Sequence, residues 1–462
     1  MPQQIQIDPS IFRAYDIRGI VEKSLTVESV YAIGKAIGSL AVESGEKIIA
    51  VGRDGRLSGP TLMAALSDGI LSTGCDVINV GVVPTPLLYY ATNVFETRSG
   101  VMLTGSHNPP EYNGLKIVIN GKTLAEEGIK DLYTRIVENR FCNGKGDMNE
   151  LAIIDRYISH ICKTVKVRRP LKVVVDCGNG VSGVVAPELY RQLGCEVHEL
   201  FCEVDGKFPN HHPDPSQPEN LHDLIEKVRA VNAEVGIAFD GDGDRIGVVT
   251  KKGEIIWPDR QLMLFAKSIL EDHPGAKIIY DVKCTNHLDS LIKEFGGEPI
   301  MWKTGHSLIK AKLAETQALL AGEMSGHIFF RDRWYGFDDA IYAGARLLEI
   351  IAASNDDIDT LFSKIPNSVN TPELKIVVSD ESKFRLMDRL IAAANFKTAS
   401  LITTIDGLRV NFADGWGLIR PSNTTPCLVL RFEAESEKVL AKIQEIFREF
   451  ILQTEPGLEL PF

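Results

Sequence analysis

The sequence lacks the marks of several protein classes. Its eight cysteines include no C-x-x-C pair, which argues against a zinc site or a disulfide framework and favours reduced thiols. No stretch approaches the roughly 18 consecutive apolar residues that a membrane span needs. The start "MPQQIQIDPSIF" has neither the basic segment nor the apolar stretch of a signal peptide. We therefore expect a soluble, cytoplasmic protein with no membrane partner.

Basic residues are too few for a partner that is a polyanion. The chain has 50 Lys and Arg against 62 Asp and Glu, a net charge of −12, which disfavours nucleic acid and anionic surfaces as partners. A small anionic substrate would need positive charge gathered locally. The 462 residues exceed what one compact core accommodates, so we expect several domains.

One pattern occurs three times along the chain. An apolar strand, a polar loop with glycine, a helix that ends at glycine and a second apolar strand follow one another in residues 47–81, 171–200 and 276–302. Strands that are apolar throughout are typical of parallel sheets covered by helices on both faces. The repetition predicts three related α/β domains with mostly parallel, mixed sheets, which we place at 1–150, 151–252 and 253–366.

The last part of the chain, 367–462, differs from the rest. Short alternating strands with "DG" turns lie between two helical segments, which favours an α+β domain with an antiparallel sheet. Each of the four predicted domains carries one conspicuous polar loop. Four loops from four domains indicate a central cleft between them.

The loop of the first domain is "TGSHNPP", residues 104–110, between two apolar strands. A hairpin needs only Gly or Asn at its turn, whereas this loop crowds hydrogen-bonding groups around Ser106. Either it is an ordinary turn, or it presents one hydroxyl for chemistry.

The loop of the second domain is "DGDGDR", in which Asp240, Asp242 and Asp244 alternate with glycines. In a locally extended backbone this spacing puts three carboxylates on one side, where they repel one another unless a cation lies among them. An EF-hand fails, because its sixth and twelfth positions hold Arg245 and Lys251 in place of Gly and Glu. We predict a site for a hard divalent ion such as Mg²⁺.

The other two loops suit a phosphorylated sugar. In "GEMSGH", Glu323 and Ser325 offer a carboxylate and a hydroxyl of the kind that sugar hydroxyls pair with, although a Gly-rich loop with a capping serine is an equal reading. In "RPSNTTP", a guanidinium, hydroxyls and turn amides form an anion cradle, although a plain turn between strands is again an equal reading. Lys283 adds a cation at the carboxyl end of a predicted parallel strand, where ligands of such sheets bind.

These motifs, in this order and together with "FRAYDIRG", "VGRDGR", "GVVPTP" and "PNHHPDP", resemble the α-D-phosphohexomutase family, in particular its bacterial phosphomannomutase/phosphoglucomutase branch. The likeness covers the whole chain. It implies a heart-shaped molecule of four domains and reversible interconversion of hexose 1- and 6-phosphates of mannose and glucose. It also implies a phosphoserine, a bound hexose 1,6-bisphosphate that turns end over end, and Mg²⁺, with glucose or mannose 1,6-bisphosphate as activator. We further expect a monomer.

The resemblance also assigns roles by position. Ser106 would carry the phosphate and, with Asp240, Asp242 and Asp244, hold the metal. The residues placed at the reacting phosphate besides Ser106 are Arg18, Lys116, Arg245 and His327, and acid and base duty falls on His327 and Lys116 in an order that the sequence leaves open. The predicted substrate contacts are Tyr15, Ser106, Lys283, His306, Glu323, Met324, Ser325, Gly326, His327, Arg420, Pro421, Ser422, Asn423 and Thr424.

Several other functions fit the same motifs. A phosphoglucosamine mutase or a strict phosphoglucomutase shares all four loops, and Met324 favours the mannose/glucose branch. A phosphoserine hydrolase or a bisphosphate synthase would use the same serine and metal. A sugar-phosphate-binding protein without catalysis would need neither Ser106 nor three aspartates, so their presence argues against it.

Overall fold

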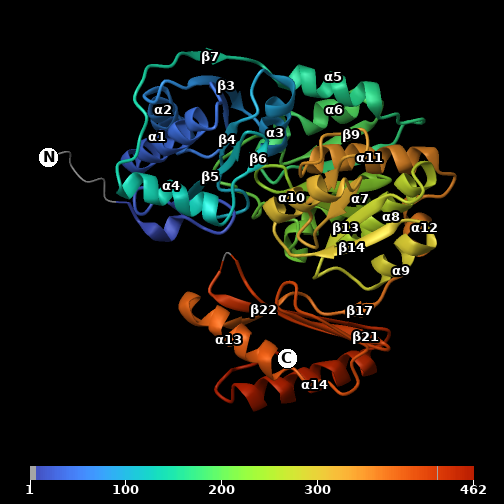
Figure 1. Ribbon diagram of the computed structural model, residues 1–462. Coiled ribbons are helices and arrows are strands. Elements are labelled where there is room, and N and C mark those ends of the chain that lie inside the picture. The colour runs from blue at the N-terminus through green and yellow to red at the C-terminus, as the bar shows by residue number, and fades with distance from the viewer. Residues whose placement is uncertain (1–6, 424) are drawn as a thin grey trace.

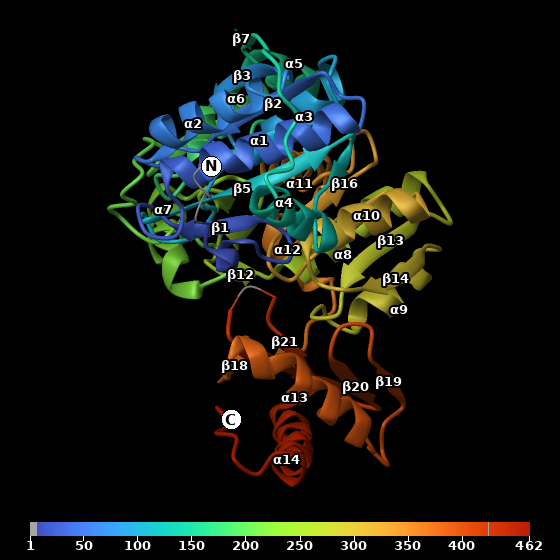
Figure 2. The same cartoon turned by 60° about the vertical axis from the view of Figure 1, so that its left-hand side comes forward.

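Four sheets follow one another along the chain in the computed structural model, which describes residues 7–423 and 425–462. In both ribbon views the fourth sheet, with its two helices, stands apart from the other three (Figure 1, Figure 2). Besides the helices named below, three short 3₁₀ segments lie at Pro9–Ile11, Val181–Val184 and Pro218–Leu221. Within the described ranges, no helix is both long and apolar enough to cross a lipid bilayer.

The first sheet is mixed. Its strand order is β1 (Ile17–Ile20), β5 (Tyr112–Ile119), β4 (Gly100–Leu103), β2 (Ile48–Arg53), β3 (Asp76–Val82) and β7 (Met148–Glu150), with β6 (Lys122–Thr123) paired to β5. Strand β5 runs antiparallel to β1 and β4, and β2, β3, β4 and β7 are parallel. The helices of this part are α1 (Val27–Glu43), α2 (Gly59–Leu71), α3 (Thr85–Val94) and α4 (Glu127–Val137).

The second and third sheets repeat this plan. The second has the order β12 (Ile255–Ile256), β11 (Ile246–Thr250), β10 (Val235–Phe239), β8 (Lys172–Asp176), β9 (Glu196–Leu200), with helices α5 (Ile154–Thr164), α6 (Ala186–Gln192) and α7 (His222–Val231). The third has the order β14 (Glu298–Trp302), β13 (Lys277–Asp281), β15 (Leu320–Gly322), β16 (Ile328–Phe330). Its helices are α8 (Pro258–Asp272), α9 (His287–Glu294), α10 (His306–Thr316), α11 (Ala340–Ala353) and α12 (Ile358–Ser363).

The three predicted strand–helix–strand units are confirmed. Strands β2 and β3 pair in parallel around α2, β8 and β9 around α6, and β13 and β14 around α9. The chain leaves α2 and α6 at Gly74 and Gly194, whose φ angles of 88° and 93° are the left-handed values that glycine adopts without strain.

The fourth sheet is antiparallel, as the sequence predicts. Its order is β17 (Val369–Asn370), β22 (Cys427–Ala434), β21 (Gly415–Pro421), β20 (Leu408–Phe412), β19 (Leu401–Thr403), with β18 (Leu374–Val377) also paired to β22. Helices α13 (Asp380–Ala393) and α14 (Glu437–Thr454) cover one face (Figure 1). The fold class of three α/β units and one α+β unit is therefore confirmed.

The apolar core is shared unequally among these parts. One continuous cluster of buried side chains includes Leu88 of α3, Phe239 of β10 and Tyr342 of α11, and so joins the first three units. The fourth unit has its own core, in which the rings of Phe432 and Phe447 lie 5.2 Å apart. Hydrophobic contacts thus hold the three α/β units together, whereas the fourth unit has a separate core.

Polar groups dominate the contact between the third and fourth units. The buried Arg409 donates to the carbonyls of Val282 and Cys284, and its guanidinium carbon lies 3.8 Å from the centre of the Trp416 ring. Among the described residues, the buried apolar cluster that spans this junction is small and consists of Val282, Trp416 and Leu418. The position of the fourth unit therefore depends on directional hydrogen bonds more than on apolar area.

Helices α1 and α2 approach closely because glycines face each other. A Cβ atom added to Gly34 would lie 2.4 Å from the Leu66 carbonyl oxygen, which is backbone and cannot rotate away. We expect Gly34→Val to destabilise the protein by about 1–3 kcal/mol, because overpacking forces the two helices apart. Thermal unfolding followed by circular dichroism measures this. Gly457→Val is the control, because nothing lies within 4 Å of a Cβ there, and an equal fall in both variants would contradict the prediction.

Candidate active site

The Ser106 loop joins the antiparallel strands β4 and β5, as predicted, and it is held rigidly. Ser106 is buried and has a φ of 49°, a left-handed conformation that a non-glycine residue adopts only under constraint. Its amide donates to the hydroxyl of Thr104 at 2.8 Å, and that hydroxyl donates to Asp54 at 2.7 Å.

Arg56 supplies the main constraint on this loop. Its buried guanidinium donates to the carbonyls of Ser106 and Asn108 at 2.8 and 2.6 Å and to those of Pro109 and Tyr112 at 2.6 and 2.9 Å. One charged donor therefore satisfies three carbonyls of a loop that has no regular secondary structure and a fourth at the first residue of β5. Arg56 stands in the motif "VGRDGR", and no local signal in the sequence predicts that it reaches a loop 50 residues away.

The three aspartates lie in the connection between the antiparallel strands β10 and β11. The prediction that they share one side of an extended backbone is wrong, because residues 240–244 form a tight turn. Asp240 Oδ1 accepts from the amides of Gly243, Asp244 and Arg245 at 3.0–3.1 Å. The turn itself gathers the carboxylates, and one oxygen from each lies within 4.8 Å of the others.

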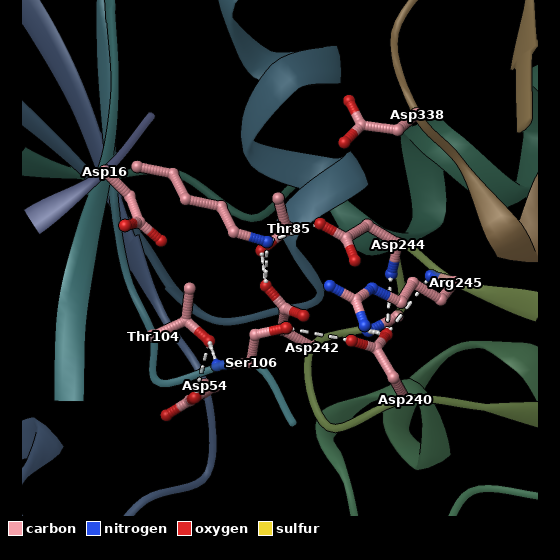
Figure 3. Close-up of polar contacts among 12 residues, drawn as sticks. Asp16, Asp54, Thr85, Thr104, Ser106, Asp240, Asp242, Asp244, Arg245 and Asp338 are labelled. Atoms are coloured by element: carbon pink, nitrogen blue, oxygen red, sulfur yellow. Dashed lines mark hydrogen bonds and ion pairs between the residues drawn. The ribbon is translucent and has the colours of Figure 1, made fainter. Parts of the chain in front are cut away.

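The two loops meet through a direct contact. Ser106 Oγ donates to Asp240 Oδ2 at 2.9 Å, although 134 residues separate them. Figure 3 shows the Ser106 side chain directed at Asp240, with Asp242 and Asp244 turned toward the same space. All four side chains are buried.

Lys116 of β5 balances part of this negative charge. Its ammonium donates to Asp242 at 2.7 Å and to Asp244 at closer range. Burial alone would lower the pKa of Lys116, but the aspartates outweigh it and raise the pKa above the usual value. For Asp240, burial and the neighbouring carboxylates raise the pKa well above its usual range, so the cluster remains short of positive charge.

Two oxygens of the triad fit a cation. Among the described residues, no donor hydrogen-bonds to Asp242 Oδ1 or Asp244 Oδ1, both of which are buried; His327 Nε2 lies 3.3 Å from the latter as an ion-pair contact. A buried carboxylate oxygen without a donor is costly unless a cation coordinates it. Three carboxylates next to a hydroxyl are an oxygen donor set of the kind that Mg²⁺ prefers.

Two further residues contact this site. Thr85, at the start of α3, donates to Asp242 at 2.5 Å. His107 Nδ1 lies 3.2 Å from Ser106 Oγ, and burial together with the nearby arginines lowers the pKa of His107 well below its usual value, so the ring is neutral. His107 directly follows Ser106 in the chain and is one of the hydrogen-bonding groups that crowd the serine, whereas Thr85 lies 157 residues from Asp242 and only the fold brings the two together.

His327 lies between two carboxylates at the edge of the triad. Its Nδ1 is 2.9 Å from Glu323 and 2.9 Å from Ser325 Oγ, and its Nε2 is 3.3 Å from Asp244. Although burial alone would lower it, these carboxylates raise the pKa of His327 to about 9, so the ring carries a proton at neutral pH. Arg245, whose Nε is 3.4 Å from His327 Nε2, adds a second cation.

The "GEMSGH" loop thus joins the site in part. Glu323 pairs with His327 and accepts a hydrogen bond from the amide of Gly305 at 2.5 Å, whereas Ser325 is half-buried. Gly326 has a φ of 103° and lies against β11, where a side chain would be crowded by Ile246. Met324 is half-buried, and its side chain packs on the main apolar core.

A line of rings connects this site to the fourth unit. The rings of His327 and His306 lie 5.6 Å apart, and those of His306 and Tyr15 lie 6.2 Å apart. The Tyr15 hydroxyl accepts a hydrogen bond from the amide of Asn423, in the loop between β21 and β22.

Two cations at the junction of the third and fourth units, Arg420 of β21 and Lys283 after β13, are each paired with a carboxylate. Arg420 Nε donates to Asp406 at 3.0 Å, while its Nη2 is buried with no hydrogen-bond partner among the described residues. Lys283 donates to Glu373 at 2.5 Å, and this contact lowers the pKa of Glu373 to about 2. Arg420 Nη2 is a donor free to bind an anion.

The remaining predicted residues fall into two groups. Arg18 lies beside the serine loop, where it donates to Asn108 and to Asp16. Pro421 ends β21, and Ser422, whose hydroxyl contacts that of Thr425 at 2.7 Å, lies in the loop between β21 and β22. Thr424 lies outside the described residues.

Comparisons with known proteins agree with this geometry. Models of phosphoglucomutase/phosphomannomutase alpha/beta/alpha domains I, II and III match residues 9–142, 155–253 and 257–369, and that of the C-terminal domain matches 373–450. A phosphomannomutase/phosphoglucomutase of Pseudomonas putida is 58% identical over 98% of each chain. The chain belongs to the phosphoglucomutase/phosphomannomutase family.

Other members of the phosphoglucomutase/phosphomannomutase family are nearly as similar. A phosphoglucomutase of Neisseria meningitidis is 54% identical over 98% of each chain. The crystal structure of a family protein from Burkholderia thailandensis, 54% identical, superposes with a TM-score of 0.96 and covers 99% of this chain and 100% of that one. The protein is thus an enzyme of the mutase class, and its predicted resemblance is confirmed.

The donor set predicts a measurable response to metal. We expect Mg²⁺ in about hundredfold excess over its dissociation constant to stabilise this family member by about 2.7 kcal/mol, because it binds only the folded state. Asp242→Asn should abolish the rise in thermal midpoint, because the metal would lose a negatively charged ligand. The exposed Asp272→Asn is the control. If neither Mg²⁺ nor EDTA changes the thermal midpoint of the wild-type protein, the metal site is refuted.

Proposed function

We propose that the protein reversibly interconverts the 1- and 6-phosphates of mannose and glucose through a phosphoserine at Ser106. The observation that carries this proposal is the contact of Ser106 Oγ with Asp240 Oδ2 at 2.9 Å. It unites a rigid, positively surrounded hydroxyl with a set of metal ligands. Mere binding of a sugar phosphate requires neither.

The phosphoryl group is exchanged between two oxygens. In the first step the bond from phosphorus to Ser106 Oγ breaks and a new bond forms to the free 1- or 6-hydroxyl of the sugar phosphate. The hydroxyl proton passes to a base, and the released Ser106 Oγ takes up a proton. This leaves a hexose 1,6-bisphosphate. After the sugar turns end over end, Ser106 Oγ gives up its proton and accepts the phosphoryl group from the other end, and the sugar oxygen that is released gains a proton.

Charge around Ser106 suits this transfer. A phosphoserine carries about −1.5 to −2 at pH 7, and catalysis of phosphoryl transfer consists mostly of positioning and neutralising that charge. Lys116, Arg245 and Arg18 lie around the loop from three different elements. The ion is assigned as Mg²⁺, held by Asp240, Asp242, Asp244 and Ser106; when bound, it would neutralise charge on the phosphoryl oxygens.

Two groups are placed for proton transfer. His327 carries a proton at neutral pH and lies next to Asp244, so we assign it as a general acid toward the sugar oxygen. Lys116 also contacts the triad, through Asp242 and Asp244. Its raised pKa in this state makes it a charge-neutralising group first, and a base only once a bound phosphosugar changes its surroundings.

The distant phosphate of the substrate is assigned to the fourth unit. Arg420 offers the unpartnered Nη2, Lys283 lies nearby on the third unit's side, and Ser422 and Asn423 supply further polar groups. Thr424 joins them on the family resemblance. The resting partners Asp406 and Glu373 keep both cations oriented while no anion is bound.

The sugar between the two phosphates is assigned to Glu323, Ser325, His306 and Tyr15, which lie between the serine loop and the phosphate loop. Because the sugar must bind in two orientations, these ligands have to accept either end. The assignment of mannose and glucose, of a hexose 1,6-bisphosphate as activator and of a monomer working in the cytoplasm completes the proposal. Phosphosugars are its small-molecule partners, without nucleic acid or membrane.

Removing the proposed nucleophile should separate chemistry from folding. We expect Ser106→Ala to lower turnover by roughly 10³-fold or more, as loss of a covalent nucleophile does, while the thermal midpoint changes little because the side chain fills scarcely any core. Ser44→Ala, an exposed serine after α1, is the matched control. Wild-type turnover in Ser106→Ala would remove this assignment.

A coupled assay decides the substrate and the reaction class together. Mannose 1-phosphate, glucose 1-phosphate and glucosamine 1-phosphate are each supplied with Mg²⁺ and a trace of bisphosphate, and 6-phosphate and inorganic phosphate are measured in parallel. We expect rapid 6-phosphate formation from the first two sugars only. Release of inorganic phosphate would indicate a hydrolase, arrest at the bisphosphate a synthase, and preference for the amino sugar a phosphoglucosamine mutase.

A further inference from the structure

A groove of about 360 Å³ lies on the outer surface of the three α/β units. Helices α3 and α5 lie side by side near the top of both ribbon views (Figure 1, Figure 2). Residues of these two helices and of the segment after β16 line the groove. The volume falls in the range of about 300–1,000 Å³ that small-molecule sites occupy. Its lining residues are Tyr90, Val94, Arg156, Ser159, His160, Lys163 and Tyr335. None of them has a role in the proposed mutase reaction.

One wall of the groove is aromatic. Tyr335 is 39% exposed, and its ring lies 5.9 Å from the rings of both Tyr90 and His160. Behind it the ring of Trp334 lies 5.3 Å away and stacks on Tyr90, with an interplanar angle of 4°. A side chain as large as Tyr335 is thus fixed in place by its neighbours and keeps part of its ring open to solvent. Such a surface offers a planar ligand a preformed stacking partner.

The other wall is cationic. Arg156, Ser159, His160 and Lys163 follow the spacing i, i+3, i+4, i+7 and so share one face of α5. With a rise of about 1.5 Å per residue, the two cations stand about 10 Å apart along the helix. Among the described residues that line the groove, none is acidic. In a chain with a net charge of −12, an acid-free groove with two cations favours an anion.

The hydrogen bonds of Tyr90 fix the rings of the groove and leave the side chains of Arg156 and Lys163 available to a ligand. The Tyr90 hydroxyl contacts His160 Nδ1 at 3.0 Å and the Arg156 carbonyl at 3.4 Å, so the rings are fixed by one another. Burial and the neighbouring Lys163 and Arg156 lower the pKa of His160. The neutral ring therefore presents a polar edge, while the charge of the groove comes from the two cations at its rim.

We propose that this groove binds a nucleoside phosphate, with the base stacked on Tyr335 and the phosphates held by Arg156 and Lys163. An inorganic anion would use only the cationic wall, and an uncharged aromatic ring only the other wall. A ligand with a planar ring at one end and phosphate at the other uses both. The proposal is independent of the mutase reaction, because the two sites share no residue.

Titration calorimetry of the full-length protein with ADP in excess Mg²⁺ tests this, with adenosine and inorganic phosphate as separate titrants. We expect saturable one-to-one binding of ADP and at least tenfold weaker binding of the two fragments. The same titration is repeated with saturating glucose 1,6-bisphosphate, which should leave ADP binding unchanged. Displacement of ADP by the bisphosphate, or equal binding of inorganic phosphate, would overturn the proposal.

Variants then locate the site. Arg156→Glu combined with Lys163→Glu should weaken ADP binding at least tenfold, because attraction becomes repulsion, and Tyr335→Ala should weaken it about tenfold through lost stacking, while Tyr335→Phe retains it. The control is Lys166→Glu, which reverses one exposed positive charge that does not line the groove. It should change ADP affinity less than twofold. Unchanged ADP affinity in the double variant, with a wild-type thermal midpoint, would place the nucleotide elsewhere and refute the groove.

Discussion

The contact between Ser106 and Asp240 depends on everything around it being rigid. A hydroxyl and an acidic turn from two different sheets meet only if both backbones are held, and each is held by internal hydrogen bonds rather than by regular structure. Arg56 donates to three carbonyls of the serine loop and to the first carbonyl of β5, and Asp240 accepts hydrogen bonds from three amides of its own turn. The continuous core of the three α/β units keeps these two loops in register.

The fourth unit follows a different physical rule. It has a separate core and touches the third unit mainly through polar groups such as Arg409. Its cation Arg420, and Lys283 across the junction, are both paired with carboxylates in the protein itself. Electrostatics therefore shapes this part of the site, whereas hydrophobic packing shapes the part around Ser106. A substrate with two charged ends needs both.

Helix α3 runs from the aspartate triad to the surface groove. Its first residue, Thr85, donates to Asp242 of the triad, and Tyr90 and Val94 farther along the helix line the groove. The helix is buried on nearly all sides. The helix therefore has three contacts at once: it packs in the shared core, it donates a hydrogen bond to the aspartate triad and it lines part of a surface groove.

The amino-acid sequence by itself determined the repeated α/β plan, the antiparallel final unit and the four polar loops, because periodicity, glycine stops and short motifs are local signals. It indicated the wrong backbone for the aspartates, which a tight turn brings together, and it gave no sign of Arg56 or Thr85 as neighbours of the site. Those contacts join residues between sheets or across long stretches of chain, and only tertiary packing decides which distant groups meet. The same holds for the groove, whose walls come from three separate segments.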